Sequence, residues 1–214
     1  MGIYVFNTDF LYEQLIRAAD TPASSHDFGK DILPSVVERN AAYAFSFLDP
    51  VTHHHAYWRD VGTVDAYWRS NMEMIGVTPE LNLYDRDWPI WTYQEQLAPA
   101  KFVFDEDGRR GMAVNSMVSG GCILSGAEVR RSLLFSNVRI ESYSVLSDCV
   151  VLPEVSIGPH CRLQRAIIDK GCVIPPQTSI GVDLDADRKR FYVSEGGIVL
   201  VTPQMLGLDL RHIR

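Results

Sequence analysis

The amino-acid sequence predicts an α/β segment followed by a parallel β-solenoid, and two observations support this fold class. First, an aliphatic residue recurs over 112–180 in repeating steps of five, six and six residues. Second, residues 1–76 lack this repeat and instead combine short apolar runs with amphipathic helical patterns. With 46% hydrophobic and 22% charged residues, the 214-residue chain has the composition of a folded protein with a buried core.

The beginning of the sequence contains signals for a strand and two helices. An apolar run at residues 3–6 predicts a strand, and Thr8 is suited to cap a helix over 8–19. A second helix is expected over 30–38, with Pro34 in its first turns, where proline is tolerated.

A second strand and a third helix follow. The strand is expected over 43–48, where aromatic residues are frequent. Thr63 is suited to cap the third helix, whose apolar stripe consists of Val64, Tyr67, Trp68, Met72 and Ile75. Two strands are too few for a covered α/β sheet. We therefore expect this region to be the last part of a larger α/β domain whose other strands lie outside the sequence.

The repeat after residue 111 forms columns at an offset of 17 residues. A step of about six fits neither a helix nor an alternating strand, but it fits short strands joined by turns, three to a coil. Such hexapeptide repeats resemble the left-handed parallel β-helix, and the hand is inferred from that resemblance. The expected columns are Ile123, Ile140, Ile157 and Ile174, then Val129, Leu146, Leu163 and Ile180, and finally Leu134, Val151 and Ile168.

Charge and cysteine content restrict the partners and the cellular compartment that we expect for this protein. The 20 basic and 27 acidic side chains give a net charge of −7, which disfavours nucleic acid as a partner. No apolar run approaches the roughly 18 residues of a membrane span, and the first residues do not form a signal peptide. The four cysteines have aliphatic neighbours and no CxxC spacing, so we expect buried, reduced thiols in a cytoplasmic protein without a membrane partner.

Two short motifs combine residue types that could bind a sugar phosphate and a metal ion. Asp27 and Phe28 precede the second helix, where a carboxylate could accept sugar hydroxyls and a ring could pack on the sugar; the alternative is that Asp27 only caps the helix. Asp60 lies in the sequence Asp-Val-Gly-Thr before the third helix. Its carboxylate could hold Mg²⁺ beside a phosphate, or it could simply satisfy backbone amides in a tight turn.

Two further groups of residues invite a ligand hypothesis. The histidines at 53–55 are adjacent, so they cannot all face one ion, and a solvated loop is the favoured interpretation. Lys170, together with the basic run at 188–190, could form an anion site. The alternative is an exposed charged face.

Several longer motifs carry a family resemblance that spans nearly the whole chain. They are Gly-Ile-Tyr-Val-Phe at 2–6, His-Asp-Phe-Gly-Lys-Asp at 26–31, Tyr-Trp-Arg-Asp-Val-Gly-Thr at 57–63, Val-Ser-Gly-Gly-Cys at 118–122 and Glu-Gly-Gly-Ile-Val-Leu at 195–200. In this set and order they resemble bacterial ADP-glucose pyrophosphorylase, that is, glucose-1-phosphate adenylyltransferase.

This resemblance implies an architecture and an activity. It implies part of a Rossmann-like nucleotidyltransferase domain over 1–76, a linker over 77–111, and a left-handed β-helix with a C-terminal extension over 112–214. The family is usually homotetrameric, and it joins ATP and glucose 1-phosphate to give ADP-glucose and pyrophosphate for glycogen synthesis. Mg²⁺ assists by offsetting the charge that develops in this transfer.

The resemblance also implies roles for individual residues. Asp60 matches one of two carboxylates that hold the Mg²⁺ ion, and Lys170 matches a basic position that binds small regulatory metabolites. Two other basic positions of the family read Pro203 and Gly207 here, which weakens the case for fructose 1,6-bisphosphate as the activator. The positions that match the glucose-phosphate pocket are Tyr4, Asp27, Phe28 and Trp58.

Other features of the family have no counterpart in the sequence. These are its glycine-rich nucleotide loop, its second metal-binding aspartate and its glucose-phosphate lysine, so we expect the isolated chain to be inactive. Two alternatives remain open. One is a non-catalytic regulatory or assembly subunit. The other is a hexapeptide-repeat acyltransferase, which would need a histidine on its coils, and His160 is the candidate.

Overall fold

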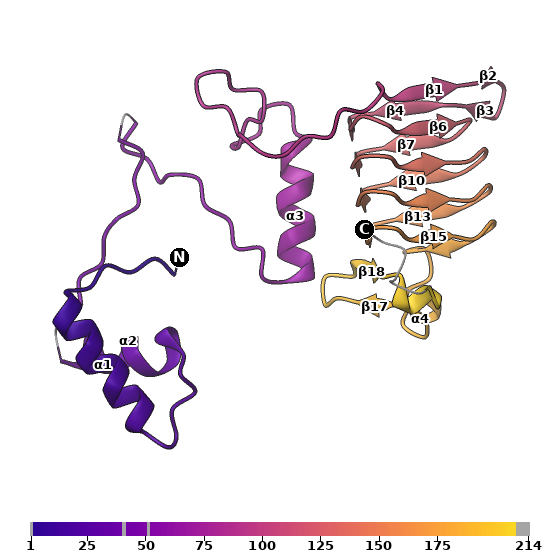
Figure 1. Ribbon diagram of the computed structural model, residues 1–214. Coiled ribbons are helices and arrows are strands. Elements are labelled where there is room, and N and C mark those ends of the chain that lie inside the picture. Colours follow the sequence, from indigo (N-terminus) through magenta and orange to yellow (C-terminus); the bar gives the residue numbers. More distant parts are fainter. Residues whose placement is uncertain (1, 40–41, 51, 209–214) are drawn as a thin grey trace. The chain divides into compact units, whose positions relative to one another are not determined.

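The computed structural model describes residues 2–39, 42–50 and 52–208, which fall into two compact units, Met1–Trp58 and Arg59–Arg214 (Figure 1). The first unit contains the helical elements at the beginning of the chain. The second contains helix α3 (Val64–Met74) and the solenoid. Within the described residues, no helix has both the length and the apolar character needed to cross a bilayer.

In the first unit, helix α1 (Thr8–Asp20) and the π-helical turn η1 (Phe28–Ile32) have side-chain caps at their starts, whereas α2 (Leu33–Glu38) has none. Helix α1 begins one residue earlier than expected, because the side chain of Asn7, and not that of Thr8, accepts a hydrogen bond from the Asp9 amide at 3.1 Å. The η1 turn leads into α2, whose first turn contains Pro34. The predicted second helix is therefore present as two joined segments.

The two strands predicted for this unit are absent from the described residues. Residues 3–6 have no ladder partner, and over 43–48 the one pairing is an isolated bridge between Leu48 and His55. A strand needs a hydrogen-bonded neighbour, and the described part of this unit supplies none. The apolar side chains that would lie in a sheet are exposed instead, as Val5 is at 97% and Phe45 at 91%.

One side chain in the small core of this unit is chemically mismatched. Gln14 of α1 is fully buried, yet neither Nε2 nor Oε1 has a hydrogen-bond partner within the described residues. Replacing Gln14 with leucine should raise the free energy of unfolding by about 1–3 kcal/mol, because the unpaired amide is removed from an apolar site. Urea unfolding measured by circular dichroism checks this. Equal transition midpoints for the wild type and Gln14→Leu would contradict it.

The solenoid consists of three parallel sheets that run along its length (Figure 1). The strands of the first sheet are β1 (Lys101–Val103), β6 (Ile123–Ser125), β9 (Arg139–Ile140), β12 (Ser156–Ile157) and β15 (Val173–Ile174). The strands of the second sheet are β4 (Met112–Val114), β7 (Glu128–Arg130), β10 (Val145–Ser147), β13 (Arg162–Gln164) and β16 (Ser179–Ile180).

The third sheet is extended by a hairpin near the end of the chain. Its parallel strands are β5 (Met117–Val118), β8 (Leu133–Leu134), β11 (Val150–Val151), β14 (Ala166–Ile168) and β18 (Val199–Val201). Strand β17 (Tyr192–Val193) pairs antiparallel with β18, and helix α4 (Leu184–Asp187) precedes it. A short 3₁₀ helix, η2 (Gln204–Leu206), follows the last strand. The parallel coils confirm the solenoid prediction and are consistent with a left-handed β-helix.

The strand register confirms the 17-residue columns from Val129 onward. Leu146 pairs with Val129 on one side and with Leu163 on the other, and Ile157 lies between Ile140 and Ile174 in the same way. The residues of these columns are at most 1% exposed, so each coil covers the apolar interior of the next.

The first coil differs from the expected columns by one residue. Its inward positions are Ala113, Val118 and Leu124, and not the neighbouring Met112, Met117 and Ile123. The cause is a shorter corner: four residues lie between Leu124 and Val129, whereas five lie between Ile140 and Leu146. Gly126 forms this tight corner with a φ of +67°. Because this corner is one residue shorter, the inward-facing positions before it move by one residue. The residues next to them are also apolar, so the apolar pattern remains.

The solenoid ladder also begins earlier than residue 112. Strand β1, inside the segment predicted as a linker, pairs with β6, so that Phe102 lies opposite Leu124. Between β1 and β4 a hairpin is inserted, made of β2 (Asp105–Glu106) and β3 (Arg109–Arg110). This insertion lengthens the coil and interrupts the 17-residue spacing, which is why the periodicity does not extend to β1.

All four cysteines are free and buried within the solenoid, as the sequence predicts. They are Cys122, Cys149, Cys161 and Cys172. Burial raises the pKa of Cys149 to about 12, and burial together with the nearby Asp169 charge does the same for Cys172. These two thiols therefore remain protonated and unreactive near neutral pH.

Candidate functional site

Aromatic rings in the first unit hold the start of the chain against the η1 turn. The rings of Tyr4 and Phe28 are stacked with centroids 6.0 Å apart and planes inclined by 15°. Phe6 lies 6.0 Å from Phe28 and 6.3 Å from Tyr4, and it also stacks on Phe10 at 6.4 Å. The structure thus brings together two residues of the predicted sugar-phosphate pocket, Tyr4 and Phe28. Tyr4 is exposed, so a ligand could reach its ring.

Asp27 lies directly before Phe28 and caps the η1 turn. Its Oδ1 accepts a hydrogen bond from the Lys30 amide at 2.9 Å, as the capping alternative predicts. The side chain is nevertheless exposed, so capping leaves it accessible to a ligand. One contact fixes the direction of the carboxylate, and the remaining lone pairs can accept further hydrogen bonds.

Asp31 braces the loop that carries Asp27, a role that the sequence motif alone did not indicate. Its Oδ2 accepts hydrogen bonds from the Asp27 amide at 2.9 Å and from the Ser25 hydroxyl at 2.7 Å. These two hydrogen bonds lower the pKa of Asp31 below its usual value. The four-residue spacing between Asp27 and Asp31 was visible in the sequence, but it is equally typical of two exposed acids on one helix.

Trp58 is the last residue of the first unit, and 46% of its surface is exposed. Its assignment to the sugar-phosphate pocket stays a prediction. The histidines at 53–55 are largely exposed, in agreement with a solvated loop. Among the described residues, no three side chains of the His, Cys, Asp or Glu type come together in a way that could hold a metal ion.

Asp60 belongs to the second unit and lies in a tight turn before helix α3 (Val64–Met74). Its Oδ1 accepts a hydrogen bond from the Gly62 amide at 3.0 Å. The Thr63 side chain then caps α3 by accepting a hydrogen bond from the Ala66 amide at 3.2 Å, as predicted. The carboxylate is exposed. Asp60 therefore satisfies a backbone amide while it also faces solvent.

The donor chemistry of this turn fits a single ligand to Mg²⁺. Mg²⁺ prefers hard oxygen donors, keeps several waters and takes one or two carboxylates together with substrate phosphates. Asp60 offers one such oxygen on a turn whose geometry is fixed by Gly62 and Thr63. Among the described residues, Asp60 is not part of a group of three or more such side chains that could hold a metal ion.

Lys170 lies in the turn between β14 and β15, where its amide donates to Oδ1 of Asp169 at 2.8 Å. It lines a pocket of about 490 Å³ together with Tyr93, Asn137, Glu95 and Glu154. Two carboxylates therefore share this pocket with the lysine, and a purely cationic anion site is not formed by these residues.

The basic run at 188–190 does not line the Lys170 pocket. Arg188 forms an ion pair with Asp185 at 2.7 Å, and the Arg190 guanidinium lies 4.6 Å from the centre of the Phe191 ring. The structure therefore favours an exposed charged face for this run. The regulatory role of Lys170 itself stays a prediction.

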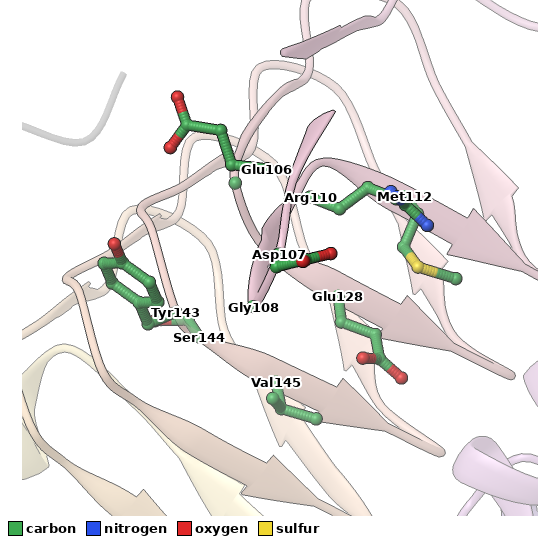
Figure 2. Close-up of a pocket in the computed structure, with 10 residues that line it drawn as sticks. Glu106, Asp107, Gly108, Arg110, Met112, Glu128, Tyr143, Ser144 and Val145 are labelled. Atoms are coloured by element: carbon green, nitrogen blue, oxygen red, sulfur yellow. The ribbon is translucent and has the colours of Figure 1, made fainter. Parts of the chain in front are cut away.

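A second pocket, of about 450 Å³, lies beside the β2–β3 hairpin and was missed by sequence reasoning (Figure 2). Acidic side chains at the hairpin, Glu106 and Asp107, line it together with Glu128, Arg110 and Tyr143. Arg110 is paired with Asp105. The hairpin was expected to be linker, and therefore no signal in the sequence placed these residues next to the coils.

Comparison with known proteins identifies both parts of the chain. A family model described as nucleotidyl transferase matches residues 1–76, and one described as GlmU-like, C-terminal hexapeptide matches residues 98–201. The glucose-1-phosphate adenylyltransferase of Methylococcus capsulatus is 66% identical over 214 residues, which cover 100% of this chain and 50% of that protein.

Two other curated proteins of the same name give similar figures. That of Nitrosospira multiformis is 60% identical over 217 residues, and that of Nitrosococcus oceani is 61% identical over 215 residues. Each match covers 100% of this chain and 51% of the relative. The chain thus spans about half the length of the curated relatives that it matches. With a nucleotidyltransferase region, a hexapeptide solenoid and relatives of one name along its whole length, the chain belongs to the glucose-1-phosphate adenylyltransferase family.

Proposed function

We propose that this chain provides the sugar-phosphate side and the solenoid of an enzyme that forms ADP-glucose and pyrophosphate from ATP and glucose 1-phosphate. The observation that carries the proposal is the group formed by Tyr4, Asp27 and Phe28, in which the residue with a capping, exposed carboxylate directly precedes one of two stacked rings. Carboxylates accept sugar hydroxyls, and aromatic rings pack on the apolar faces of sugars. This combination matches the substrate that the relatives' name specifies.

In the proposed reaction, the residues of this chain bind and orient the sugar phosphate. Asp27 accepts hydroxyl hydrogen bonds, while Tyr4, Phe28 and Trp58 cover the sugar ring. Asp60 holds a Mg²⁺ ion. Bound Mg²⁺ would neutralise charge on the phosphates during in-line transfer. We place the nucleotide-binding residues in the half of the family sequence that this chain does not match.

The remaining family features extend the same proposal. They are a homotetramer, control by small metabolites near Lys170, a role in glycogen synthesis and a cytoplasmic location. The location is supported by four buried thiols without a disulfide. The mixed charge of the Lys170 pocket, with Glu95 and Glu154, favours an effector that carries donor groups as well as an anionic group.

The test compares the isolated chain with a fused protein. In the fused protein, the half of the Methylococcus capsulatus relative that this chain does not match is joined to the amino end of the chain. We expect ADP-glucose formation from the fused protein with ATP, glucose 1-phosphate and Mg²⁺, and none from the isolated chain. A folded fused protein without activity would overturn the proposal, and activity of the isolated chain would overturn the division of roles.

A non-catalytic assembly subunit is the second candidate. It is favoured by the contrast between the closed core of the solenoid and the first unit, whose described residues contain no strand and only one isolated bridge. Mixed oligomers with the full-length relative, with no ADP-glucose formation by the fused protein, would support it. The acyltransferase alternative has less support, because His160 stacks on Tyr143 with ring centroids 4.8 Å apart, and the family model for 1–76 describes a nucleotidyl transferase.

A further inference from the structure

Helix α3 follows the turn that Gly62 and Thr63 close, and it packs along the third sheet of the solenoid. The predicted apolar stripe forms this contact, including Tyr67 and Trp68. The stripe covers side chains that point outward from the coils and would otherwise meet water. They are Leu133, Val150, Ile167 and Ile198, all at most 5% exposed.

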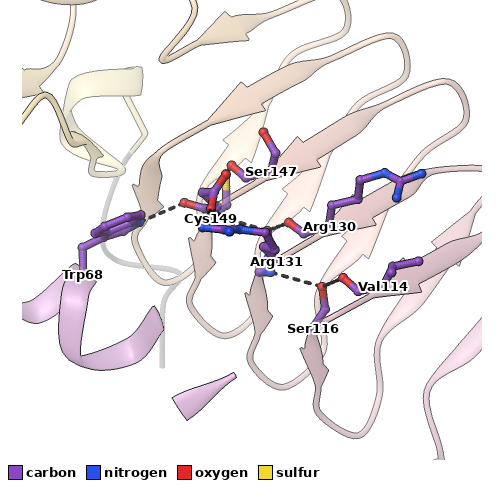
Figure 3. A network of polar contacts seen from close by, with 9 residues as sticks. Trp68, Val114, Ser116, Arg130, Arg131, Ser147 and Cys149 are labelled. Atoms are coloured by element: carbon purple, nitrogen blue, oxygen red, sulfur yellow. Dashed lines mark hydrogen bonds and ion pairs between the residues drawn. The ribbon is translucent and has the colours of Figure 1, made fainter. Parts of the chain in front are cut away.

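A column of charged residues at one corner of the coils receives the Trp68 indole. Arg131, Asp148 and Arg165 follow each other at 17-residue intervals, and each has a positive φ, of 43°, 54° and 47°. Arg131 is paired with Asp148 at 2.7 Å. The Trp68 Nε1 donates to the Asp148 carbonyl oxygen at 2.8 Å (Figure 3). The Arg165 guanidinium lies 5.1 Å from the centre of the Trp68 ring.

The loop between β17 and β18 binds the first turn of the same helix. The Ser194 hydroxyl donates to Asp65 Oδ1 at 2.7 Å, and the Gly196 amide donates to Asp65 Oδ2 at 3.4 Å. From the corner column, Arg165 Nη2 donates to the Gly196 carbonyl oxygen at 2.8 Å. Asp65 and Arg165 therefore converge on one loop. We call the set Asp65, Trp68, Asp148, Arg165 and Ser194–Gly196 the α3 cradle.

The α3 cradle holds the first turn of α3, which is the turn of the helix nearest to Asp60 in the sequence. Asp65 could stabilise its own helix from the first turn without a partner. Instead it contacts a loop 129 residues away in the sequence, and that loop is also held by Arg165. The cradle thus fixes the end of α3 that lies next to Asp60, and the hydrogen bond between Asp60 and Gly62 continues this fixed structure to the carboxylate.

We propose that the α3 cradle sets the direction in which Asp60 presents its carboxylate, so that Asp65, Trp68 and Arg165 are positioning residues for the metal-dependent reaction. This inference rests on the proposed function, in which Asp60 holds Mg²⁺. Catalysis of this kind depends strongly on geometry, because a displacement of about 1 Å can lower a rate by about 100-fold. The solenoid then serves as the support that aligns a residue of the catalytic domain.

The first test detects structural changes around the α3 cradle in the isolated chain, and it does not depend on enzyme activity. A Cβ atom on Gly196 would lie 2.3 Å from Asp65 Oδ1, so Gly196→Ala should displace the carboxylate without changing any charge. We expect a shifted NMR amide signal for Gly62 and about tenfold faster hydrogen exchange in the first turn of α3. Trp68→Phe removes the indole donor together with part of the packed ring, keeps an aromatic side chain, and should produce the same changes to a smaller degree.

A matched control lies on a different sheet. Arg139 is exposed on β9, where it pairs with Glu141 at 2.6 Å, and it is not a member of the α3 cradle. Arg139→Ala should leave the Gly62 signal and the exchange of α3 unchanged. Should Gly196→Ala fail to fold, Trp68→Phe and Arg165→Met carry the test, since each removes a contact of the cradle. Unchanged Gly62 signals in the folded variants would overturn the positioning role.

The second test measures Mg²⁺ dependence in the fused protein. Gly196→Ala should raise the Mg²⁺ concentration for half-maximal rate by about tenfold and lower the maximal rate. Asp65→Glu keeps the carboxylate, so its maximal rate should fall less than that of Asp65→Ala. An inactive wild-type fused protein would refute the proposed function, while the NMR test would still decide the role of the cradle. If the fused protein is active and Gly196→Ala leaves the Mg²⁺ dependence of its rate unchanged, the positioning role alone is refuted.

Discussion

Replacement of Asp60 with asparagine should lower the rate of ADP-glucose formation by the fused protein by about 100-fold or more. The change removes the negative charge that is proposed to hold Mg²⁺, but it keeps an oxygen that can accept the hydrogen bond from Gly62. The fold of the turn should therefore persist. Initial rates over a range of Mg²⁺ concentrations, with the unfolding midpoint measured in parallel, check both statements.

The control for this experiment is an acid of the same type in a different place. Asp107 lies at the exposed tip of the β2–β3 hairpin, away from the Asp60 turn in sequence. Asp107→Asn should change neither the rate nor its Mg²⁺ dependence. Full activity of Asp60→Asn would mean that this carboxylate only shapes the turn, which is the alternative that the sequence left open.

Truncation of Leu124 to alanine should lower the free energy of unfolding by about 2–5 kcal/mol, the range usual for a leucine removed from a close-packed core. Leu124 is 0% exposed and lies opposite Ile140 within the coils. The neighbouring Ile123 points to the other face of the same strand and is partly exposed, so Ile123→Ala should cost less than Leu124→Ala. Urea unfolding measured by circular dichroism compares the two variants.

This pair of variants also distinguishes the observed register from the one that the periodicity predicts. The 17-residue columns place Ile123 inside, whereas the strand pairing places Leu124 there. Because adjacent strand residues face opposite sides, the two registers predict opposite orders of destabilisation. A larger loss for Ile123→Ala would show that the first coil keeps the 17-residue spacing.

Much of the solenoid could be predicted because its repeat is visible in the sequence as a regular spacing of aliphatic residues. Leu146, Leu163 and Ile180 occupy equivalent places in successive coils, and their strands pair in the same register. The cap at Thr63 and the buried cysteines were predictable for a related reason, since both depend on local residue types. Asn7 was missed as a cap because the adjacent Thr8 is also a suitable residue.

The strands expected at 3–6 and 43–48 show the limit of such local signals. Apolar and aromatic residues such as Val5 and Phe45 favour a strand, but a strand forms only where another strand offers its backbone groups. For the candidate site, the sequence identified Tyr4, Asp27, Phe28 and Asp60 as residues of interest. The stacking of Tyr4 on Phe28 and the support of Asp27 by Asp31 came only from the structure.

By itself, the sequence determined the three-sided solenoid, the approximate helix positions and the family motifs, because each of these is specified by residues within one repeat or one turn. The tertiary structure decided the register of the first coil, the early start of the ladder at β1 and the contact between Asp65 and Ser194. These features depend on residues that are distant in the chain. The interactions between these residues form only when folding brings them together, so no local sequence pattern predicts them.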